Sequence, residues 1–244
     1  MGTGAVEGAN ILINVENVTG TGRDDYLQGS DANEEFRGGA GNDILRGGGG
    51  VDTLHGDVGN DWLYGGAGED ILHGGEGNDG LFGGGGNDTL NGGAGIDVLL
   101  GGAGINTLKG DAGDDIIAFS NGGQETATGG AGADKFVINA LNKVGASVAE
   151  VDIIKDFKIG EDKIHIIGDM NNLSLEFVPA DGSAEAHFLL KKGDNVLVKV
   201  ETDATAFTAA TVFDFAQFEF AADLAELATD LNYDFSGYDM SGLL

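Results

Sequence analysis

The fold is decided by residues 38–118, which read GGAGNDILR (38–46), GGGGVDTLH (47–55), GDVGNDWLY (56–64), GGAGEDILH (65–73), GGEGNDGLF (74–82), GGGGNDTLN (83–91), GGAGIDVLL (92–100), GGAGINTLK (101–109) and GDAGDDIIA (110–118). Nine nonapeptides therefore follow one another without an insertion. Weaker copies come before them at residues 23–28 and 29–37, and another copy, GGAGADKFV, begins at Gly129. A fixed period of this kind is the signature of a protein in which each repeat packs on its neighbours.

Each repeat carries one apolar residue, two positions after its acidic residue. The set is Leu27, Phe36, Leu45, Leu54, Leu63, Leu72, Leu81, Leu90, Leu99, Leu108 and Ile117. Because side chains alternate across a strand, each of these residues is predicted to point inward from a short strand whose neighbours point outward. Glycines at the first, second and fourth positions let the backbone turn sharply and bring its carbonyl oxygens close to an ion.

The apolar ladder is too thin to hold the repeats folded. One buried leucine contributes roughly 1.5–3 kcal/mol, whereas ordering nine residues costs on the order of 1 kcal/mol or more for each. We therefore expect a bound metal to supply much of the folding free energy.

The composition points to cations as partners. The chain has 41 acidic and 12 basic residues, a formal net charge of -29, 46 glycines and one proline. Such a charge repels nucleic acids and anionic membranes, so neither is expected as a partner. Cysteine is absent, which excludes disulfides and thiolate metal sites. No apolar run is long enough to predict insertion into a membrane, and residues 1–15 lack the pattern of a Sec-type signal peptide.

Over this length the repeat resembles the RTX, or hemolysin-type calcium-binding, nonapeptide family. The resemblance implies an all-β fold: a right-handed parallel β-roll with two nonapeptides per coil and calcium ions between successive turns.

With two nonapeptides per coil, residues 18 apart lie at the same edge of the roll. The sixth-position side chains then form two columns. The first column is Asp25, Asp43, Asp61, Asp79, Asp97 and Asp115, and the second is Glu34, Asp52, Asp70, Asp88 and Asn106. Carboxylates stacked about 4.8 Å apart repel one another by a few kcal/mol. A divalent cation between them reverses the sign of that interaction.

The expected cofactor is calcium, as several ions. Carboxylate and carbonyl oxygens suit a hard cation, and the open geometry does not suit the strict octahedron of magnesium. The predicted metal ligands are Asp25, Asp43, Asp52, Asp61, Asp70, Asp79, Asp88, Asp97, Asp115 and Asp134, with Gly38, Gly47, Gly56, Gly65, Gly74, Gly83 and Gly92. Glu34 and Asn106 depart from aspartate, which weakens the outermost sites of the second column.

The two outward faces of the roll differ. The apolar face carries Tyr26, Ile44, Trp62, Tyr64, Phe82, Val98, Leu100, Ile116 and Ala118. We expect the C-terminal segment to cover it, with a partner protein or a ligand as the alternative. The polar strip on the opposite face carries Glu35, Thr53, Ile71, Thr89 and Thr107 beside Arg37, His55, His73, Asn91 and Lys109. It is expected to be solvated; the alternative is binding of an anionic polysaccharide, as the resemblance to repeat modules of alginate epimerases implies.

The second half of the chain has longer apolar runs. The segment VDIIKDFKIGEDKIHI (151–166) resembles the DxIxDFxxGxDKI signature that follows the repeats of serralysin-type proteases, with Asp152, Asp156 and Asp162 at its acidic positions. We predict a capping strand or junction at residues 1–18, the calcium-binding roll at 19–137, a β-rich cap at 138–200 and an acidic tail at 201–244. The tail should contain a short helix, from Leu224, Leu227 and Leu231, and resembles a type I secretion signal.

The sequence contains no HExxH, GxSxG or phosphate-binding loop, and no enzymatic activity is expected. The predicted function is that of a secreted, extracellular calcium-binding protein or module, which passes through the type I secretion machinery and folds when it meets extracellular calcium. Two alternatives remain: a module that binds a polysaccharide or a cell-surface glycan, and the C-terminal accessory domain of a larger secreted enzyme such as a serralysin, lipase or alginate epimerase.

Overall fold

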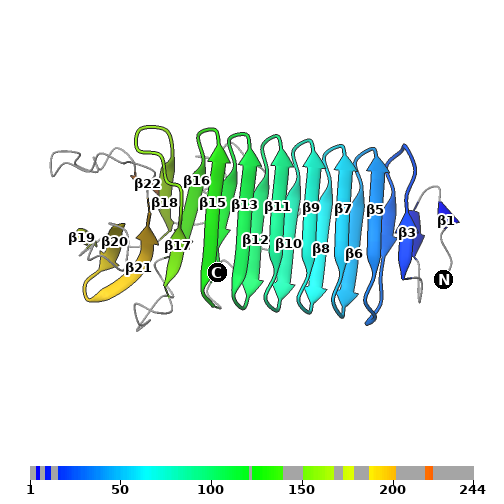
Figure 1. Ribbon diagram of the computed structural model, residues 1–244, viewed down its shortest axis with the longest axis horizontal. Helices are drawn as coiled ribbons and strands as arrows, with labels where there is room; N and C mark the ends of the chain where they lie inside the picture. The colour runs from blue at the N-terminus through cyan, green and yellow to red at the C-terminus, as the bar shows by residue number, and fades with distance from the viewer. Residues whose placement is uncertain are drawn as a thin grey trace.

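The structure is a computed structural model, and it describes residues 4–5, 9–11, 16–120, 123–139, 151–167, 173–178, 187–201 and 218–221. All regular elements in these ranges are strands, and they form two long sheets. The coils stack along the long axis of the molecule, from β1 at one end to the β19–β20 pair at the other (Figure 1). The all-β fold and the parallel β-roll are therefore confirmed.

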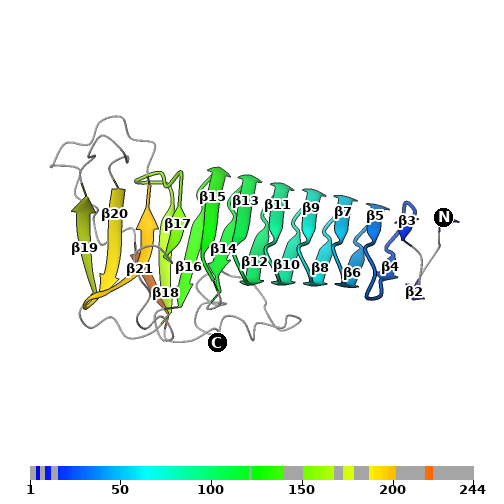
Figure 2. The same cartoon turned by 60° about the horizontal axis from the view of Figure 1, so that its bottom comes forward.

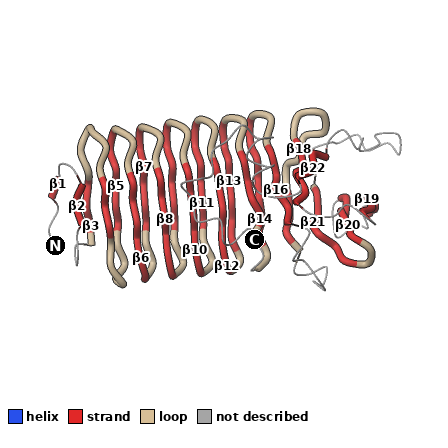
Figure 3. Tube along the Cα trace, turned by 180° about the vertical axis from the view of Figure 1, so that it is seen from behind, coloured by secondary structure: helices blue, strands red, loops and turns tan. Residues whose placement is uncertain are grey.

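The strands alternate between the two sheets as the chain winds. The twelve-stranded sheet contains, in order, β1 (Gly4–Ala5), β3 (Asn17–Thr19), β5 (Glu35–Ala40), β7 (Thr53–Val58), β9 (Ile71–Glu76), β11 (Thr89–Ala94), β13 (Asn106–Ala112), β15 (Glu125–Ala131), β17 (Asp152–Ile154), β21 (Asn195–Val200), β20 (His187–Lys192) and β19 (Leu173–Val178). The ten-stranded sheet contains β2 (Ala9–Ile11), β4 (Tyr26–Gln28), β6 (Ile44–Gly49), β8 (Trp62–Ala67), β10 (Gly80–Gly85), β12 (Val98–Ala103), β14 (Ile116–Phe119), β16 (Lys135–Asn139), β18 (Lys163–Ile167) and β22 (Phe218–Ala221). Figures 2 and 3 show the two sheets facing each other along the repeats, with β20 and β19 extending the twelve-stranded sheet beyond the other.

The register confirms two nonapeptides per coil. Leu45 of β6 lies beside Leu63 of β8, and Leu54 of β7 lies beside Leu72 of β9, each 18 residues apart. The coils lengthen toward the C-terminal end, where Asn106 lies beside Glu125 and Lys135 beside Lys163.

The core is a single ladder of side chains enclosed between the sheets. Leu45, Leu54, Leu63, Leu72 and Leu81 are all 0% exposed, and the ladder continues through Leu90, Leu99, Leu108 and Ile117. Toward the C-terminal end it widens, because Phe119, Phe136, Phe157 and Ile164 join the same cluster. The apolar residues predicted to point inward, one from each repeat, are thus the residues that fill the interior.

The last coils extend both sheets beyond the repeats. Strand β17 pairs with β15, and β18 pairs with β16, both in parallel. The twelve-stranded sheet then ends in antiparallel pairs of β21 with β20 and of β20 with β19. A hairpin thus spans residues 187–200, whereas the predicted helix at 224–231 lies outside the described residues. No described segment is a helix long and apolar enough to cross a membrane.

Candidate metal centre

The two columns of acidic side chains lie inside the roll, at the turns that join the two sheets. At most sixth positions the backbone N–H donates to Oδ1 of the residue one coil further on, from Asp43 to Asp61 at 2.6 Å and from Asp61 to Asp79 at 2.7 Å. In the second column the N–H of Asp52 donates to Asp70 Oδ1 at 2.8 Å. The structure therefore brings the sequence-predicted aspartates together, and one oxygen of each is held by the preceding coil.

The other carboxylate oxygen has no such partner. Oδ2 is buried and accepts no hydrogen bond in Asp43, Asp52, Asp61, Asp70, Asp79, Asp88, Asp97, Asp115 and Asp134. Buried polar atoms in folded proteins are nearly always paired, and burying an unpaired charge is costly. Nine such oxygens in two rows therefore call for a cation or for protons.

Asp25 and Glu34 begin the columns and differ from the aspartates that follow. Oδ2 of Asp25 accepts hydrogen bonds from the N–H of Thr21 at 2.6 Å and from its hydroxyl group at 2.9 Å. Glu34 Oε1 accepts a bond from the hydroxyl group of Ser30 at 2.7 Å. At this end of the roll, protein donors thus take up the acceptor capacity of Asp25 Oδ2, which stays open in the middle coils, whereas Oε2 of Glu34 is buried and accepts no hydrogen bond, as in the aspartates that follow.

The first glycine of each repeat leaves a space beside the unpaired oxygen. A Cβ added to Gly65 would lie 2.7 Å from the carbonyl oxygen of Gly83 and still closer to Oδ2 of Asp70. The same clash with an aspartate Oδ2 occurs at Gly38, Gly47, Gly56, Gly74, Gly83 and Gly92. Since none of these glycines has a positive φ, they are needed for space. By contrast, Gly66 (φ 115°) and Gly68 (φ 141°), at the second and fourth positions, adopt backbone angles that favour glycine.

Electrostatics in the columns favour binding of a positive charge. Burial is the main cause that raises the pKa of Asp97 to about 8, and the charges of Asp115 and Asp79 add to the effect. Burial likewise raises the pKa of Asp61 and Asp115 to about 7. At neutral pH Asp97 therefore holds a proton, and Asp61 and Asp115 are partly protonated, unless another cation replaces the protons.

The donor atoms fit calcium. Within the described ranges, no three side chains of His, Cys, Asp or Glu gather around one point that could hold a metal. A cation in the columns would therefore need main-chain oxygens as well, and the first-position carbonyl groups lie beside the carboxylates. Carboxylate and carbonyl oxygens without nitrogen or sulfur are the ligand set that Ca²⁺ prefers.

Sequence reasoning missed two sets of residues. In the longer coils, Asp162 continues the first column, with Oδ1 accepting the N–H of Asp134 at 3.0 Å and Oδ2 that of Lys158 at 2.8 Å. The Asp-Lys-apolar order at 134–136 and again at 162–164 was a usable signal. The second set is an outer ladder at the fifth position, in which Asn42 Oδ1 accepts the N–H of Asn60 at 2.9 Å and Asn60 Oδ1 that of Asn78 at 2.7 Å. The frequent asparagine at this position pointed to it.

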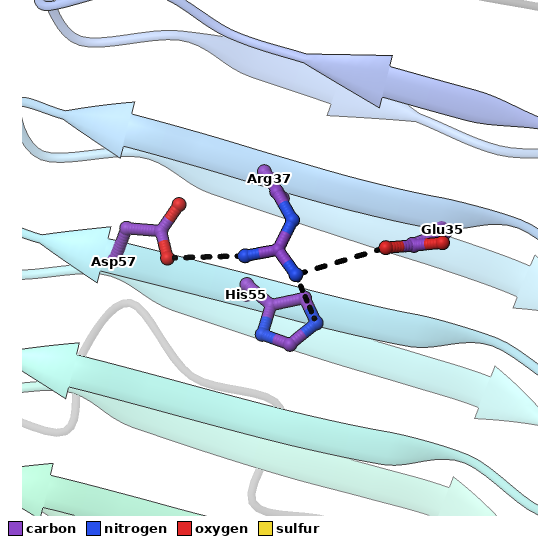
Figure 4. A network of polar contacts seen from close by, with 4 residues as sticks. All are labelled: Glu35, Arg37, His55 and Asp57. Atoms are coloured by element: carbon purple, nitrogen blue, oxygen red, sulfur yellow. Dashed lines mark hydrogen bonds and ion pairs between the residues drawn. The ribbon is translucent and has the colours of Figure 1, made fainter.

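The polar strip is a network centred on Arg37 (Figure 4). Its guanidinium group lies 3.7 Å from Glu35 Oε1, 3.5 Å from Asp57 Oδ1 and 3.3 Å from His55 Nε2. The rings of His55 and His73 stack at 4.8 Å between centroids, so they do not converge on one ion. Burial, followed by the charge of Arg37, lowers the pKa of both histidines.

The apolar face is largely buried. Val98, Leu100, Ile116 and Ala118 are buried, while Trp62 and Tyr64 are partly buried against the same cluster. The ring of Phe82 stacks with Trp62 at 5.9 Å and with Tyr64 at 5.1 Å. The C-terminal segment predicted to cover this face falls mostly on residues 202–217 and 222–244, which lie outside the described residues.

Comparison with known proteins identifies the repeats. The family described as RTX calcium-binding nonapeptide repeat (4 copies) matches residues 19–54, 28–63, 55–90 and 91–123. Residues 19–123 are RTX repeats. The matched stretches hold both columns from Asp25 to Asp115, so the RTX repeats and the buried carboxylates coincide. The RTX β-roll is a structural calcium-binding fold and not a catalytic family. No curated protein matches the chain.

Proposed function

We propose that this chain is a secreted calcium-binding RTX protein, or a module of one, whose roll folds when calcium fills the two columns. The observation that carries the proposal is the double row of buried Oδ2 atoms, each beside the first-position glycine of its repeat. The fold alone would leave these charges uncompensated.

The proposed ligands are the column aspartates and the first-position glycines. They are Asp25, Asp43, Asp52, Asp61, Asp70, Asp79, Asp88, Asp97, Asp115 and Asp134, with Gly38, Gly47, Gly56, Gly65, Gly74, Gly83 and Gly92. Calcium would supply the positive charge that cancels repulsion between successive coils. The protein contributes the rest. Oδ1 accepts a hydrogen bond from the coil before, and Oδ2 faces the space beside the first-position glycine, which we call the cradle. The glycine leaves room there for the ion.

Folding would then depend on the compartment. Calcium is scarce inside cells and abundant outside, so the charged columns would keep the chain unfolded before export and favour the roll afterwards. We propose type I secretion machinery as the export partner, with its signal in residues 201–244.

Calcium titration of the full chain tests the proposal, with circular dichroism and the fluorescence of Trp62 as readouts. At neutral pH we expect β structure to appear when calcium is added and not when magnesium is added at the same concentration. Gly65→Ala fills one cradle and should raise the calcium midpoint and cost about 1–3 kcal/mol of stability. The matched control is Gly85→Ala, because Gly85 has no positive φ and a Cβ there meets nothing within 4 Å. Native β structure in chelator at pH 8, or equal effects of the two substitutions, would contradict the proposal.

A second candidate function is binding of an anionic polysaccharide or cell-surface glycan to the polar strip. Arg37, His55 and His73 lie on neighbouring strands of one sheet, and Lys109 lies two strands beyond His73, in a chain that is otherwise acidic. Arg37 is already paired with Glu35 and Asp57, so a glycan would have to compete with both carboxylates. Glycan-array binding in calcium should be lost in Arg37→Ala and Lys109→Ala; binding that survives both substitutions would rule out this surface. The role of accessory domain in a larger secreted enzyme is compatible with either function.

A further inference from the structure

We call each column residue, together with its neighbour one coil further on, a rung. The rung that begins at position 106 of the second column differs from those before it, because this position holds asparagine. Asn106 begins β13 and is 1% exposed. Its Oδ1 accepts the N–H of Asp88 at 2.8 Å, as an aspartate oxygen does elsewhere in the column. The hydrogen bond from the preceding coil is therefore kept at Asn106, whereas the N–H of Asn106 itself donates to the carbonyl oxygen of Gln124 at 3.2 Å and not to a side chain.

The amide nitrogen of Asn106 fills the place that Oδ2 takes in the other rungs. It donates to the carbonyl oxygen of Gly102 at 3.1 Å and to Oε1 of Glu125 at 3.2 Å. A Cβ added to Gly101 would meet the side chains of Asn106 and Glu125, whereas at Gly83 it meets Asp88 Oδ2 and the carbonyl oxygen of Gly101. The cradle at this rung is thus occupied by protein atoms.

Glu125 is satisfied within the same rung. It lies beside Asn106 in the longer coil, 19 residues on, where Ser120 takes the place of the first-position glycine. Oε2 of Glu125 accepts the N–H of Ser120 at 2.6 Å, and the hydroxyl group of Ser120 donates to the carbonyl oxygen of Gly102 at 2.5 Å. The carboxylate of Glu125 and the carbonyl group of Gly102 could otherwise face a cation, but both accept hydrogen bonds from N–H or O–H groups of the protein.

The contrast with the preceding rungs is chemical. Asp70 and Asp88 each present a buried Oδ2 without a hydrogen-bond partner, whereas Asn106 presents an NH₂ group, which repels a cation. We infer that the rung formed by Asn106 and Glu125 holds its two coils together without calcium, so that the second column binds one ion fewer than its length suggests. The inference rests on the proposed function, since it concerns the same columns.

The test is the number of calcium ions bound by the full chain at saturation, measured by titration calorimetry and by metal analysis of the desalted protein. Asn106→Asp restores an Oδ2 and should raise the number by one. Asn106→Ala removes both the amide and its oxygen and should leave the number unchanged while weakening the fold. The control is Asp70→Asn in the same column, which should lower the number.

The outcomes separate the inference from the proposed function. A loss of one ion in Asn106→Ala would show that Asn106 is a ligand and would overturn the inference, as would an unchanged number in a folded Asn106→Asp. If Asn106→Asp does not fold, Asn106→Ala decides alone. A wild-type chain that binds no calcium, with no change in Asp70→Asn, would instead overturn the proposed function.

Discussion

In excess chelator, the roll should be folded at pH 5 and unfolded at pH 8. The cause is the buried columns, in which burial raises the pKa of Asp97 to about 8, of Asp52, Asp61 and Asp115 to about 7, and of Asp79, Asp88 and Asp134 to about 6. A carboxyl group with a raised pKa binds its proton more tightly in the folded chain than in the unfolded chain. Its stabilising effect is complete below the ordinary pKa of 3.8 and is lost as the pH rises through the folded value.

The size of the effect is large enough to decide folding. One pKa unit corresponds to about 1.4 kcal/mol, so raised pKa values at several column carboxyl groups act on the scale of the roughly 5–15 kcal/mol that stabilises an ordinary domain. A protonated Oδ2 can also donate to the first-position carbonyl oxygen beside it, which replaces part of what a metal ion would provide.

Far-ultraviolet circular dichroism between pH 4 and 9, in chelator, measures this transition. Asp97→Asn removes the group with the highest pKa value and should move the midpoint to higher pH, whereas Asp194→Asn, in an exposed turn, should leave it in place. Calcium should abolish the transition and release protons as it binds between pH 6 and 8. Equal amounts of β structure in chelator at pH 5 and pH 8 would disprove that protonation of the column carboxyl groups controls folding.

Leu72→Ala should cost about 2–5 kcal/mol of stability in saturating calcium. Leu72 is 0% exposed and lies between Leu54 and Leu90 of the neighbouring coils, so truncation leaves a cavity in the middle of a core one side chain wide. In a stack of repeats, each coil is stabilised only by its neighbours. The loss therefore cannot be spread over a larger core.

The matched control for Leu72→Ala is Ile71→Ala in the same strand. Ile71 is 40% exposed on the outer face, and its truncation should change stability by no more than about 0.5 kcal/mol. Urea unfolding of both variants, at the same calcium concentration, gives the comparison. Similar losses in the two variants would mean that the leucine ladder does not form the core in solution.

The period of the sequence predicted the repeat region well, because each repeat places the same residue types at the same point of the coil. The inward ladder through Leu72 follows from that period, and the 18-residue register and the two columns through Asp61 and Asp70 follow from the two nonapeptides per coil that the family resemblance implies. The ligand roles of the column residues and the domain boundaries at 18, 137 and 200 remain predictions.

The repeat period no longer predicts which residues are neighbours where the coils become longer than 18 residues. Glu125 lies 19 residues after its neighbour Asn106, and Asp162 lies 28 residues after Asp134, so a fixed spacing does not find them. The bond between Asn106 and Glu125 depends on where the longer coil places a side chain, which the sequence pattern does not contain. The fifth-position ladder needs a different signal, because its asparagines serve the backbone of the next coil, which neither the apolar nor the acidic position of the repeat indicates.

That ladder also gives the stack a weak seam. Asn60 and Asn78 each accept a hydrogen bond from an N–H of the coil that follows, whereas the column aspartates accept one from the coil before. At most corners, side chains thus bind both neighbouring coils. Ile96 and Ile105, like Val51 nearer the N-terminal end, interrupt this outer ladder, because their side chains have no oxygen to accept an N–H from the next coil; the two isoleucines do so at both corners of one coil. At this boundary the roll relies on the hydrogen bond between Asn106 and Glu125, which joins the same two coils, so Asn106→Ala should make it the first place to part under tension along the axis.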